Sequence, residues 1–386
     1  MVGFTGTRRL LSNPLWTTLT ADESGKKPRP VTVAMTARRR GEAASVSRRR
    51  FLGAAGATGA AALAGCTGTI TGGGGGLSEL RVAYMPIYPD MQYFVMQEEG
   101  YFDDLPVEVS GTLFSDGPSI VQASATGDFD VMMFGIVPAM IVMDKGIPSR
   151  ITAANIEDAM QILATDEFAG MWAEHGTDAF SVFEEEKGRT FTFGTFPPGS
   201  VPDILLRFWI EEELGLDPES DVEITALGGA GPVRQALLSE KIDGTSIMEP
   251  VPTVIEANDA PFSPIAWAGD FMPGQPAAVT LMHDRLREEN REVAVEFVRQ
   301  HQRATEFALS NPDRAAQHAS TVIGEEALPV ETARQAMESR ASAFITDPHE
   351  IESGAGVFAE YAARLGKTEA ELSVDELFDY GVYDGL

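Results

Sequence analysis

The chain has 386 residues, of which 44% are hydrophobic, and a formal net charge of −29 at pH 7. This length and apolar content allow two lobes of ordinary domain size, each with a real core. The acidic balance argues against a nucleic-acid partner, because phosphate binding needs a basic stripe that this sequence does not supply. With a single cysteine, Cys66, the chain cannot form a disulfide within itself.

The N-terminal region has the pattern of an export signal. Arg48 and Arg49 precede an apolar run rich in Ala and Gly at 51–65, and Cys66 follows directly. The arginine pair resembles a twin-arginine signal, and Leu-Ala-Gly-Cys at 63–66 resembles a lipobox, whose cysteine becomes lipidated. The alternative is a core helix beside a solvated arginine patch, but the run is too short to span a bilayer and its side chains are too small to pack well.

We therefore expect residues 1–65 to be a disordered leader and signal, starting at Met1 or Met35. Residues 66–77 are expected to form a glycine-rich, flexible tether, in which the ten residues 67–76 span roughly 17 Å on average. The mature chain would then be lipid-anchored on the outer face of the cytoplasmic membrane. Its attachment would be the lipid alone, because no later segment has 18 consecutive apolar residues.

Without residues 1–65 the chain carries 18 basic and 55 acidic residues, a net formal charge of −37. Repulsion among these charges acts over about 30 Å in 0.01 M salt but over only about 3 Å in 1 M salt. Only four of the basic residues are lysines. This composition is typical of a salt-adapted, halophilic protein, although an ordinary acidic protein remains the alternative.

From residue 80 onward, apolar strands alternate with helical stretches, a pattern typical of an α/β fold. A first series predicts strands at 80–85, 107–110, 130–134 and 150–154, and helices at 90–99, 120–126 and 138–145. A second series predicts strands at 161–165, 190–194, 222–227, 245–248 and 263–268, and helices at 202–214 and 233–240.

A strand at 277–282 is placed to cross back to the first lobe, and the pattern from residue 285 is helical. The sequence therefore predicts lobe 1 from residues 78–158 with 275–386, and lobe 2 from residues 159–274.

Seven short motifs resemble, in order, those of one family of transport receptors. They lie at 81–86, 100–102, 127–131, 135–139, 194–200, 236–244 and 248–250. The chain resembles the solute-binding proteins of ABC importers in the nitrate, sulfonate, taurine and bicarbonate group, which includes binders of thiamine pyrimidine precursors. The resemblance implies a two-lobe, type II periplasmic-binding-protein-like fold, each lobe a doubly wound, mostly parallel sheet, joined by two crossover strands. It also implies a solute held in the cleft by hinge closure, and a permease with a cytoplasmic ATPase as partner; we expect a monomer.

In a doubly wound sheet, the crevice lies beyond the carboxyl ends of the strands, where helix N-termini present free amide groups. Each loop there has a second interpretation, in which Gly and Pro only make turns, Ser and Asp only cap helices, and the tyrosines belong to the core. Convergence of several loops on one cleft favours solute binding. The candidate binding residues are Tyr84, Met85, Tyr88, Ser115, Asp116, Gly117, Ser119, Gly135, Ile136, Thr195, Pro198, Gly199, Ser200, Gly229, Met248 and Glu249.

The charge of the solute stays open at this point. An anion site is expected to contain Arg or Lys, yet these loops have none. Arg234 is the nearest cation, and is either a site residue or a helix-surface cation. Glu249 is either a surface residue or a site residue that binds a cation or an N–H donor of the solute. The solute is thus a nitrate-, sulfonate- or bicarbonate-like anion, or a small heteroaromatic such as a thiamine precursor.

Two other functions compete with transport. The five histidines lack metal-ligand spacing and no Gly-x-Ser-x-Gly motif occurs, so we expect no metal, no cofactor and no catalysis. An enzyme of pyrimidine-precursor synthesis on the same fold is the weaker alternative. A sensor that reports solute to a membrane kinase is the stronger one, because its binding head would have the same sequence features.

The lipid anchor can be tested with one substitution. Cys66→Ser should release the protein from membranes into the soluble fraction, because a hydroxyl cannot carry the thioether-linked lipid. Fractionation of cells producing either form measures this, with Thr67→Ser as a control that keeps the cysteine. Continued membrane association of the Cys66→Ser protein would contradict lipidation.

Overall fold

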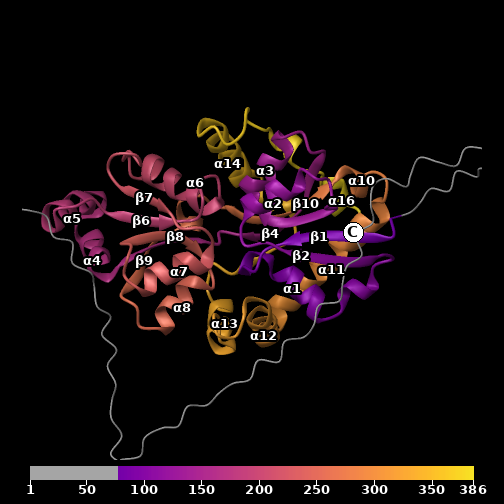
Figure 1. The fold of residues 1–386 in the computed structure, drawn as a ribbon, viewed down its shortest axis with the longest axis horizontal. Coiled ribbons are helices and arrows are strands. Elements are labelled where there is room, and N and C mark those ends of the chain that lie inside the picture. Colours follow the sequence, from indigo (N-terminus) through magenta and orange to yellow (C-terminus); the bar gives the residue numbers. More distant parts are fainter. Residues whose placement is uncertain (1–76) are drawn as a thin grey trace, which may run out of the picture. The chain divides into compact units, whose positions relative to one another are not determined.

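The computed structural model describes residues 77–386, which form two β-sheets covered by helices (Figure 1). Arg48, Arg49, Cys66 and nearly all of the expected tether lie outside the described residues. The first sheet has the order β11-β4-β10-β3-β1-β2 and comprises β1 (Glu79–Tyr84), β2 (Glu108–Leu113), β3 (Val131–Gly135), β4 (Ser149–Glu157), β10 (Pro276–His283) and β11 (Ala343–Phe344). The second has the order β7-β6-β8-β5-β9 and comprises β5 (Met160–Thr165), β6 (Thr192–Thr195), β7 (Glu223–Ala226), β8 (Gly244–Met248) and β9 (Phe262–Trp267).

The two sheets repeat one topology, with β2-β1-β3-β10-β4 of the first matching β7-β6-β8-β5-β9 of the second. We refer to residues 78–158 with 275–386 as lobe 1 and to residues 159–274 as lobe 2, because each set contains the strands of one sheet. Strand composition follows position: β3 is apolar and buried inside its sheet, whereas the edge strand β2 is polar and largely exposed.

Both sheets are mixed, so the expectation of mostly parallel sheets was wrong. In lobe 1, β1 pairs in parallel with β2 and β3, but β10 is antiparallel to β3 and β4. In lobe 2, β6 pairs in parallel with β7 and β8, but β5 is antiparallel to β8 and β9. The antiparallel pairs involve the strands that carry the chain between lobes, since β4 leads into β5, and β9 leads through a short helix into β10.

Helices cover both sheets. Lobe 1 contains α1 (Met91–Glu98), α2 (Gly117–Ser124), α3 (Ile136–Asp144), α10 (Asp284–Arg287), α11 (Arg291–Ser310), α12 (Pro312–Ile323), α13 (Val330–Met337), α14 (Glu352–Arg364), α15 (Val374–Leu377) and α16 (Tyr380–Tyr383). Lobe 2 contains α4 (Asp166–His175), α5 (Ala179–Lys187), α6 (Val201–Phe208), α7 (Ala230–Leu238), α8 (Val251–Ala257) and α9 (Ala268–Phe271). Within residues 77–386, none of the helices is both long and apolar enough to cross a membrane.

The sequence pattern missed α8 and the short α9, and it also missed the two helices α4 and α5. Their polar faces are strongly acidic, and they are held by an aromatic core in which Phe168 lies 4.2 Å from Phe191, between ring centroids. Phe180 and Phe183 of α5 pack against the same rings. The expected helix at 202–214 is α-helical only in α6, and continues as a π-helical turn at Trp209–Glu213.

The C-terminal helices of lobe 1 contact lobe 2 on two sides. Helix α13 packs against α8, and α14 packs against both α3 and α6. Figure 1 shows α14 and α13 on opposite sides of the sheets. The Tyr361 hydroxyl donates to Glu211 Oε2 at 2.5 Å, and Arg364 pairs with Glu211 and Glu212, both at 2.9 Å. The lobes are therefore joined by side-chain contacts as well as by the crossover strands.

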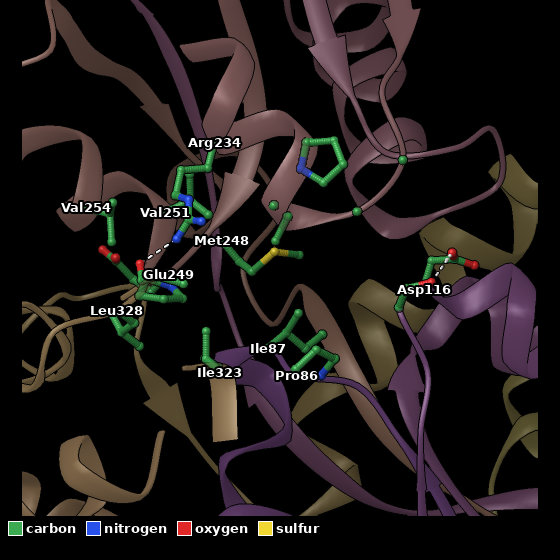
Figure 2. A pocket seen from close by; sticks show the side chains of 18 residues that line it. Pro86, Ile87, Asp116, Arg234, Met248, Glu249, Val251, Val254, Ile323 and Leu328 are labelled. Atoms are coloured by element: carbon green, nitrogen blue, oxygen red, sulfur yellow. Dashed lines mark hydrogen bonds between the residues drawn. The ribbon is translucent and has the colours of Figure 1, made fainter. Parts of the chain in front are cut away.

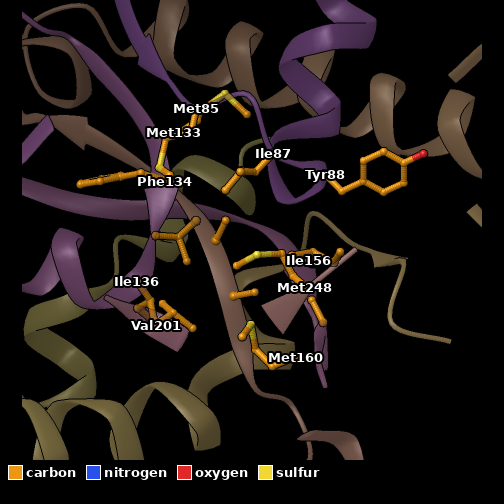
Figure 3. Packing of buried hydrophobic residues seen from close by; sticks show 14 of the residues in the cluster. Met85, Ile87, Tyr88, Met133, Phe134, Ile136, Ile156, Met160, Val201 and Met248 are labelled. Atoms are coloured by element: carbon orange, nitrogen blue, oxygen red, sulfur yellow. The ribbon is translucent and has the colours of Figure 1, made fainter. Parts of the chain in front are cut away.

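Apolar side chains from both lobes meet at the centre of the boundary between them (Figure 3). Here the Gly135 backbone lies close to a side chain of lobe 2, because a Cβ on Gly135 would lie 3.0 Å from Val201 Cγ2. Similarly, a Cβ on Gly229 of lobe 2 would lie 2.9 Å from the Ser115 carbonyl oxygen. Glycine at both positions permits the lobes to touch, and the middle of the expected gap is consequently filled by the protein itself.

A buried polar network centred on Asn155 ties together several segments of lobe 1. Asn155 Nδ2 donates to Asp90 Oδ1 at 3.2 Å, and Asn155 Oδ1 accepts from Thr280 Oγ1 at 2.8 Å. His301 Nε2 lies 3.1 Å from the same Oδ1, and His301 Nδ1 lies 3.2 Å from Thr346 Oγ1. Since Asn155 Oδ1 only accepts, His301 must donate from Nε2, and its neutral form can accept at Nδ1. Burial favours that neutral form.

Burial lowers the pKa of His301 to about 3, against 6.5 for the ordinary side chain. Below pH 6.5 the unfolded chain binds a proton that the folded protein does not, so the free energy of unfolding should fall as the pH drops from 6.5 toward 3. Between roughly pH 6.5 and pH 5, we predict that the free energy of unfolding falls by about 2 kcal/mol less in His301→Gln than in the wild type.

Urea unfolding of the wild type and the His301→Gln variant, near neutral and near acidic pH, measures this difference. His175→Gln, at an exposed position, is the control and should keep the wild-type pH dependence. The same pH dependence in all three proteins would show that His301 is not held neutral.

Candidate functional site

A cavity of about 500 Å³ lies between the two lobes (Figure 2). Lobe 1 contributes the turns after β1 and β2 and the turn between α12 and α13, while lobe 2 contributes the β7–α7 turn, the end of β8 and helix α8. The cavity thus lies beyond the carboxyl ends of the strands, where ligands bind in open α/β sheets. Six aliphatic or thioether side chains make up much of its wall: Ile87, Ile323 and Leu328 from lobe 1, and Met248, Val251 and Val254 from lobe 2.

Glu249 directly follows β8 and is only 3% exposed. Its Oε1 accepts from Gln161 Nε2 at 3.2 Å, and its Oε2 accepts from Thr253 Oγ1 at 2.9 Å and from the Thr253 backbone N at 3.3 Å. The last bond caps the first turn of α8. Burial raises the pKa of Glu249, and hydrogen bonds from Ser339, Thr253 and Gln161 oppose that rise. Protein donors therefore already engage both carboxylate oxygens.

Asp116 is the N-cap of α2 and is likewise occupied. Its Oδ1 accepts from the Ser119 backbone N at 2.8 Å and from Ser119 Oγ at 2.7 Å, while its Oδ2 accepts from Ser115 Oγ at 2.9 Å. Partial burial works to raise the pKa of Asp116, but these hydrogen bonds outweigh it and the pKa is lowered. The charged form is thus stabilised by its own loop.

Arg234 is the single cationic residue among those that line the cavity. It lies on α7 of lobe 2, and its Nη1 donates to the backbone carbonyl of Ala327 in lobe 1, a bond drawn in Figure 2. Its Nε is buried and has no hydrogen-bond partner among the described residues. A cation and an aliphatic wall are therefore the two chemical features that this cavity offers from its side chains.

Across residues 77–386, no group of three or more His, Cys, Asp or Glu side chains is placed to hold a metal ion. No curated protein matches the chain. The model of the NMT1-like family matches residues 73–323, about two thirds of the chain. The chain belongs to the NMT1-like family.

Solved structures similar to this NMT1-like chain share its fold at low sequence identity. The periplasmic nitrate-binding protein NrtA of Synechocystis PCC 6803 has a TM-score of 0.66 and 16% identity, over 80% of this chain and 88% of that one. The ligand-binding component of an ABC-type import system from Staphylococcus aureus, solved with zinc bound, has a TM-score of 0.63 and 15% identity, over 80% and 98%. The periplasmic aliphatic sulphonate-binding protein of Escherichia coli has a TM-score of 0.62 and 15% identity, over 78% and 92%. The expected α/β, type II binding-protein fold is confirmed.

The NMT1-like fold brings some of the predicted site residues together. Five of the sixteen line the cavity: Ser115, Asp116, Gly229, Met248 and Glu249. Three others line a separate hollow of about 440 Å³ beside α2, α3 and the β6–α6 turn: Ser119, Pro198 and Gly199. The prediction of several loops converging between the lobes thus corresponds to two hollows on either side of the α2 N-terminus.

The remaining eight predicted residues line neither hollow: Tyr84, Met85, Tyr88, Gly117, Gly135, Ile136, Thr195 and Ser200. Packing accounts for their positions. Tyr84 stacks on Tyr93 with ring centroids 3.7 Å apart, and the buried Tyr88 hydroxyl donates to the Ala333 carbonyl. Ser200 caps α6. For the two tyrosines, the structure agrees with the core interpretation that the sequence left open.

Sequence reasoning missed the wall contributed by Ile323, Ala327 and Leu328. These residues lie at the turn between α12 and α13, in a region whose pattern indicates only amphipathic helices packed on lobe 1. Gly324 and Pro329 signal a turn there, but no local signal places that turn against lobe 2. Ala327 and Leu328 also lie beyond the residues that the NMT1-like family model matches.

The raised pKa of Glu249 has a testable effect on stability. Because the folded pKa exceeds the ordinary value of 4.5, the wild type should lose stability as the pH rises above 4.5, until the pH passes the folded pKa. We predict that Glu249→Gln gains free energy of unfolding relative to the wild type over that range. Urea titrations across the range measure it, with Glu256→Gln, on the exposed side of α8, as the control. A difference that does not change with pH would contradict the raised pKa.

Proposed function

We propose that the protein is an extracytoplasmic solute receptor of an ABC importer, anchored through Cys66 and delivering its solute to a permease driven by a cytoplasmic ATPase. The observation that carries this proposal is the cavity walled by both lobes. A solute held there contacts both lobes, so its binding energy favours the arrangement in which they are together. Such capture requires no catalytic group.

Similar proteins and the expected anchor support the same role. Among the solved proteins with this fold are a component of an ABC-type import system, a nitrate-binding protein and a sulphonate-binding protein. A lipid at Cys66 and a glycine-rich tether would hold the receptor at high local concentration near its permease.

The cavity favours an organic solute over an inorganic anion. A volume of about 500 Å³ falls within the range of pockets that hold drug-sized ligands. A nitrate- or bicarbonate-sized ion could bond to Arg234 but would leave most of the aliphatic wall without a contact, and the aliphatic side chains could not replace the rest of its lost water. No aromatic side chain lines the cavity, so a heteroaromatic ring such as that of a thiamine precursor would lack a stacking surface.

A solute screen by thermal unfolding in about 1 M salt tests this proposal. A ligand at about 100 times its dissociation constant stabilises the folded protein by about 2.7 kcal/mol, and so raises the unfolding temperature measurably. We predict that organic solutes with an aliphatic part raise the unfolding temperature of the wild type, and that Val254→Trp, which fills the cavity from α8, abolishes the rise.

Leu309→Trp is the matched control, because Leu309 is 57% exposed and lies outside the cavity-lining residues. It should keep the wild-type response. If no compound in a broad panel of organic and inorganic nutrients bound, the proposed receptor function would be wrong. Turnover of a bound solute would also contradict it. An unchanged response in Val254→Trp would place the binding site elsewhere.

A further inference from the structure

The polar side chains of the cavity differ in what they can still bind. Asp116 and Glu249 are held by donors from their own neighbourhoods, so neither presents a bare carboxylate to a cationic solute. Arg234, by contrast, has N–H donors that no residue of 77–386 accepts from. Its Nη1 bonds the Ala327 carbonyl, its Nε is buried without a partner, and its Nη2 makes no hydrogen bond to another residue of 77–386.

The absence of an acidic partner for Arg234 is unusual in this chain. Twelve of the fourteen arginines between residues 77 and 386 form an ion pair with a carboxylate of the described structure. Arg234 and Arg150 are the two that form none there. Asp and Glu greatly outnumber Lys and Arg in this sequence, and the two carboxylates that line the cavity are held by other donors. Arg234 therefore has charge and donors available for an anion of the solute.

The geometry of the guanidinium indicates which anion fits. With Nη1 directed to Ala327, the edge formed by Nε and Nη2 is the one that keeps its donors. Two parallel N–H groups along one edge match the two oxygens of a carboxylate, which binds such a fork in a bidentate manner. The bond to Ala327 also fixes the plane of the group, so little side-chain freedom remains to be lost on binding.

The rest of the cavity indicates the body of the solute. Its wall is built from aliphatic and thioether side chains of both lobes, and an apolar chain in contact with them would be removed from water. A Lys at position 234 would be a point charge without the fork, and a Gln would keep a donor for Ala327 but lose the charge.

We propose that Arg234 selects the solute and that the cavity takes an aliphatic carboxylate whose acid group pairs with the Nε–Nη2 edge. This inference rests on the receptor function proposed above. It adds the chemical class of the solute. It also gives the Ala327 carbonyl, which lies outside residues 73–323 of the family match, the role of positioning Arg234.

Titration calorimetry with hexanoate, hexanamide and 1-hexanol tests the inference on the full-length protein. Hexanoate should bind the wild type about tenfold or more tighter than the two neutral compounds, since bonds between charged groups are the stronger ones. Arg234→Gln should bring the three affinities to within about twofold of one another. Arg234→Lys should restore part of the preference for hexanoate, because it restores the charge without the fork.

Arg364→Gln is the matched control. Arg364 also bridges the lobes, through Glu211 and Glu212, but it does not line the cavity, so this variant should keep the wild-type preference. Equal affinities of the wild type for hexanoate and hexanamide, no hexanoate binding, or a preference that survives in Arg234→Gln would each overturn the inference. Binding of neutral solutes, lost in Val254→Trp, would still leave the receptor function in place, whereas a protein that binds no solute would remove both.

Discussion

The two lobes can meet as they do because glycine leaves room for the opposite lobe at two points of their boundary. A Cβ at Gly229 would lie 2.9 Å from the Ser115 carbonyl oxygen, and a Cβ at Gly135 would lie 3.0 Å from Val201 Cγ2, so a larger residue at either position would crowd the boundary between the lobes. The cavity follows from this contact, since the turns that make its walls are brought together only when the strand ends face one another across the boundary. The Asn155 network helps to position the cavity residues Pro86 and Ile87, because it holds Asp90. The Asp90 carboxylate accepts from the Met85 backbone N at 2.8 Å and fixes the turn carrying Pro86 and Ile87.

Electrostatics in this protein works mainly through pairing and burial. Most arginines of the described region are bound to carboxylates, which offsets part of the repulsion expected from so acidic a composition. Three groups without an ion pair depart from this pattern: Glu249, His301 and Arg234. Glu249 and His301 are held without a charged partner, and burial disfavours their charged forms. Arg234 differs, because it lines the cavity and forms no ion pair with a carboxylate of residues 77–386.

Much of the fold was predictable, because strands and turns carry local signals. The strand expected at 80–85 appears at Glu79–Tyr84, and the returning strand expected at 277–282 appears as β10 in the first sheet. The site was predictable only as a set of loops. Whether a residue such as Tyr88 faces a cavity or packs away depends on Ala333, far along the chain, and such pairings leave no mark in a local pattern. The same holds for Leu328, whose place in the cavity wall depends on how α13 docks against lobe 2.

Helix α14 gives the molecule a third mechanical link. It is part of lobe 1 by sequence, yet Tyr361 and Arg364 grip Glu211 of lobe 2, and Phe208 of α6 lies against the Tyr361 ring with centroids 5.5 Å apart. Any separation of the lobes must therefore either break these contacts or shift α14 relative to α3. Any opening of the lobes would thereby be limited from the C-terminal end of the chain, on the side opposite to α13, as well as by the two segments that connect the lobes.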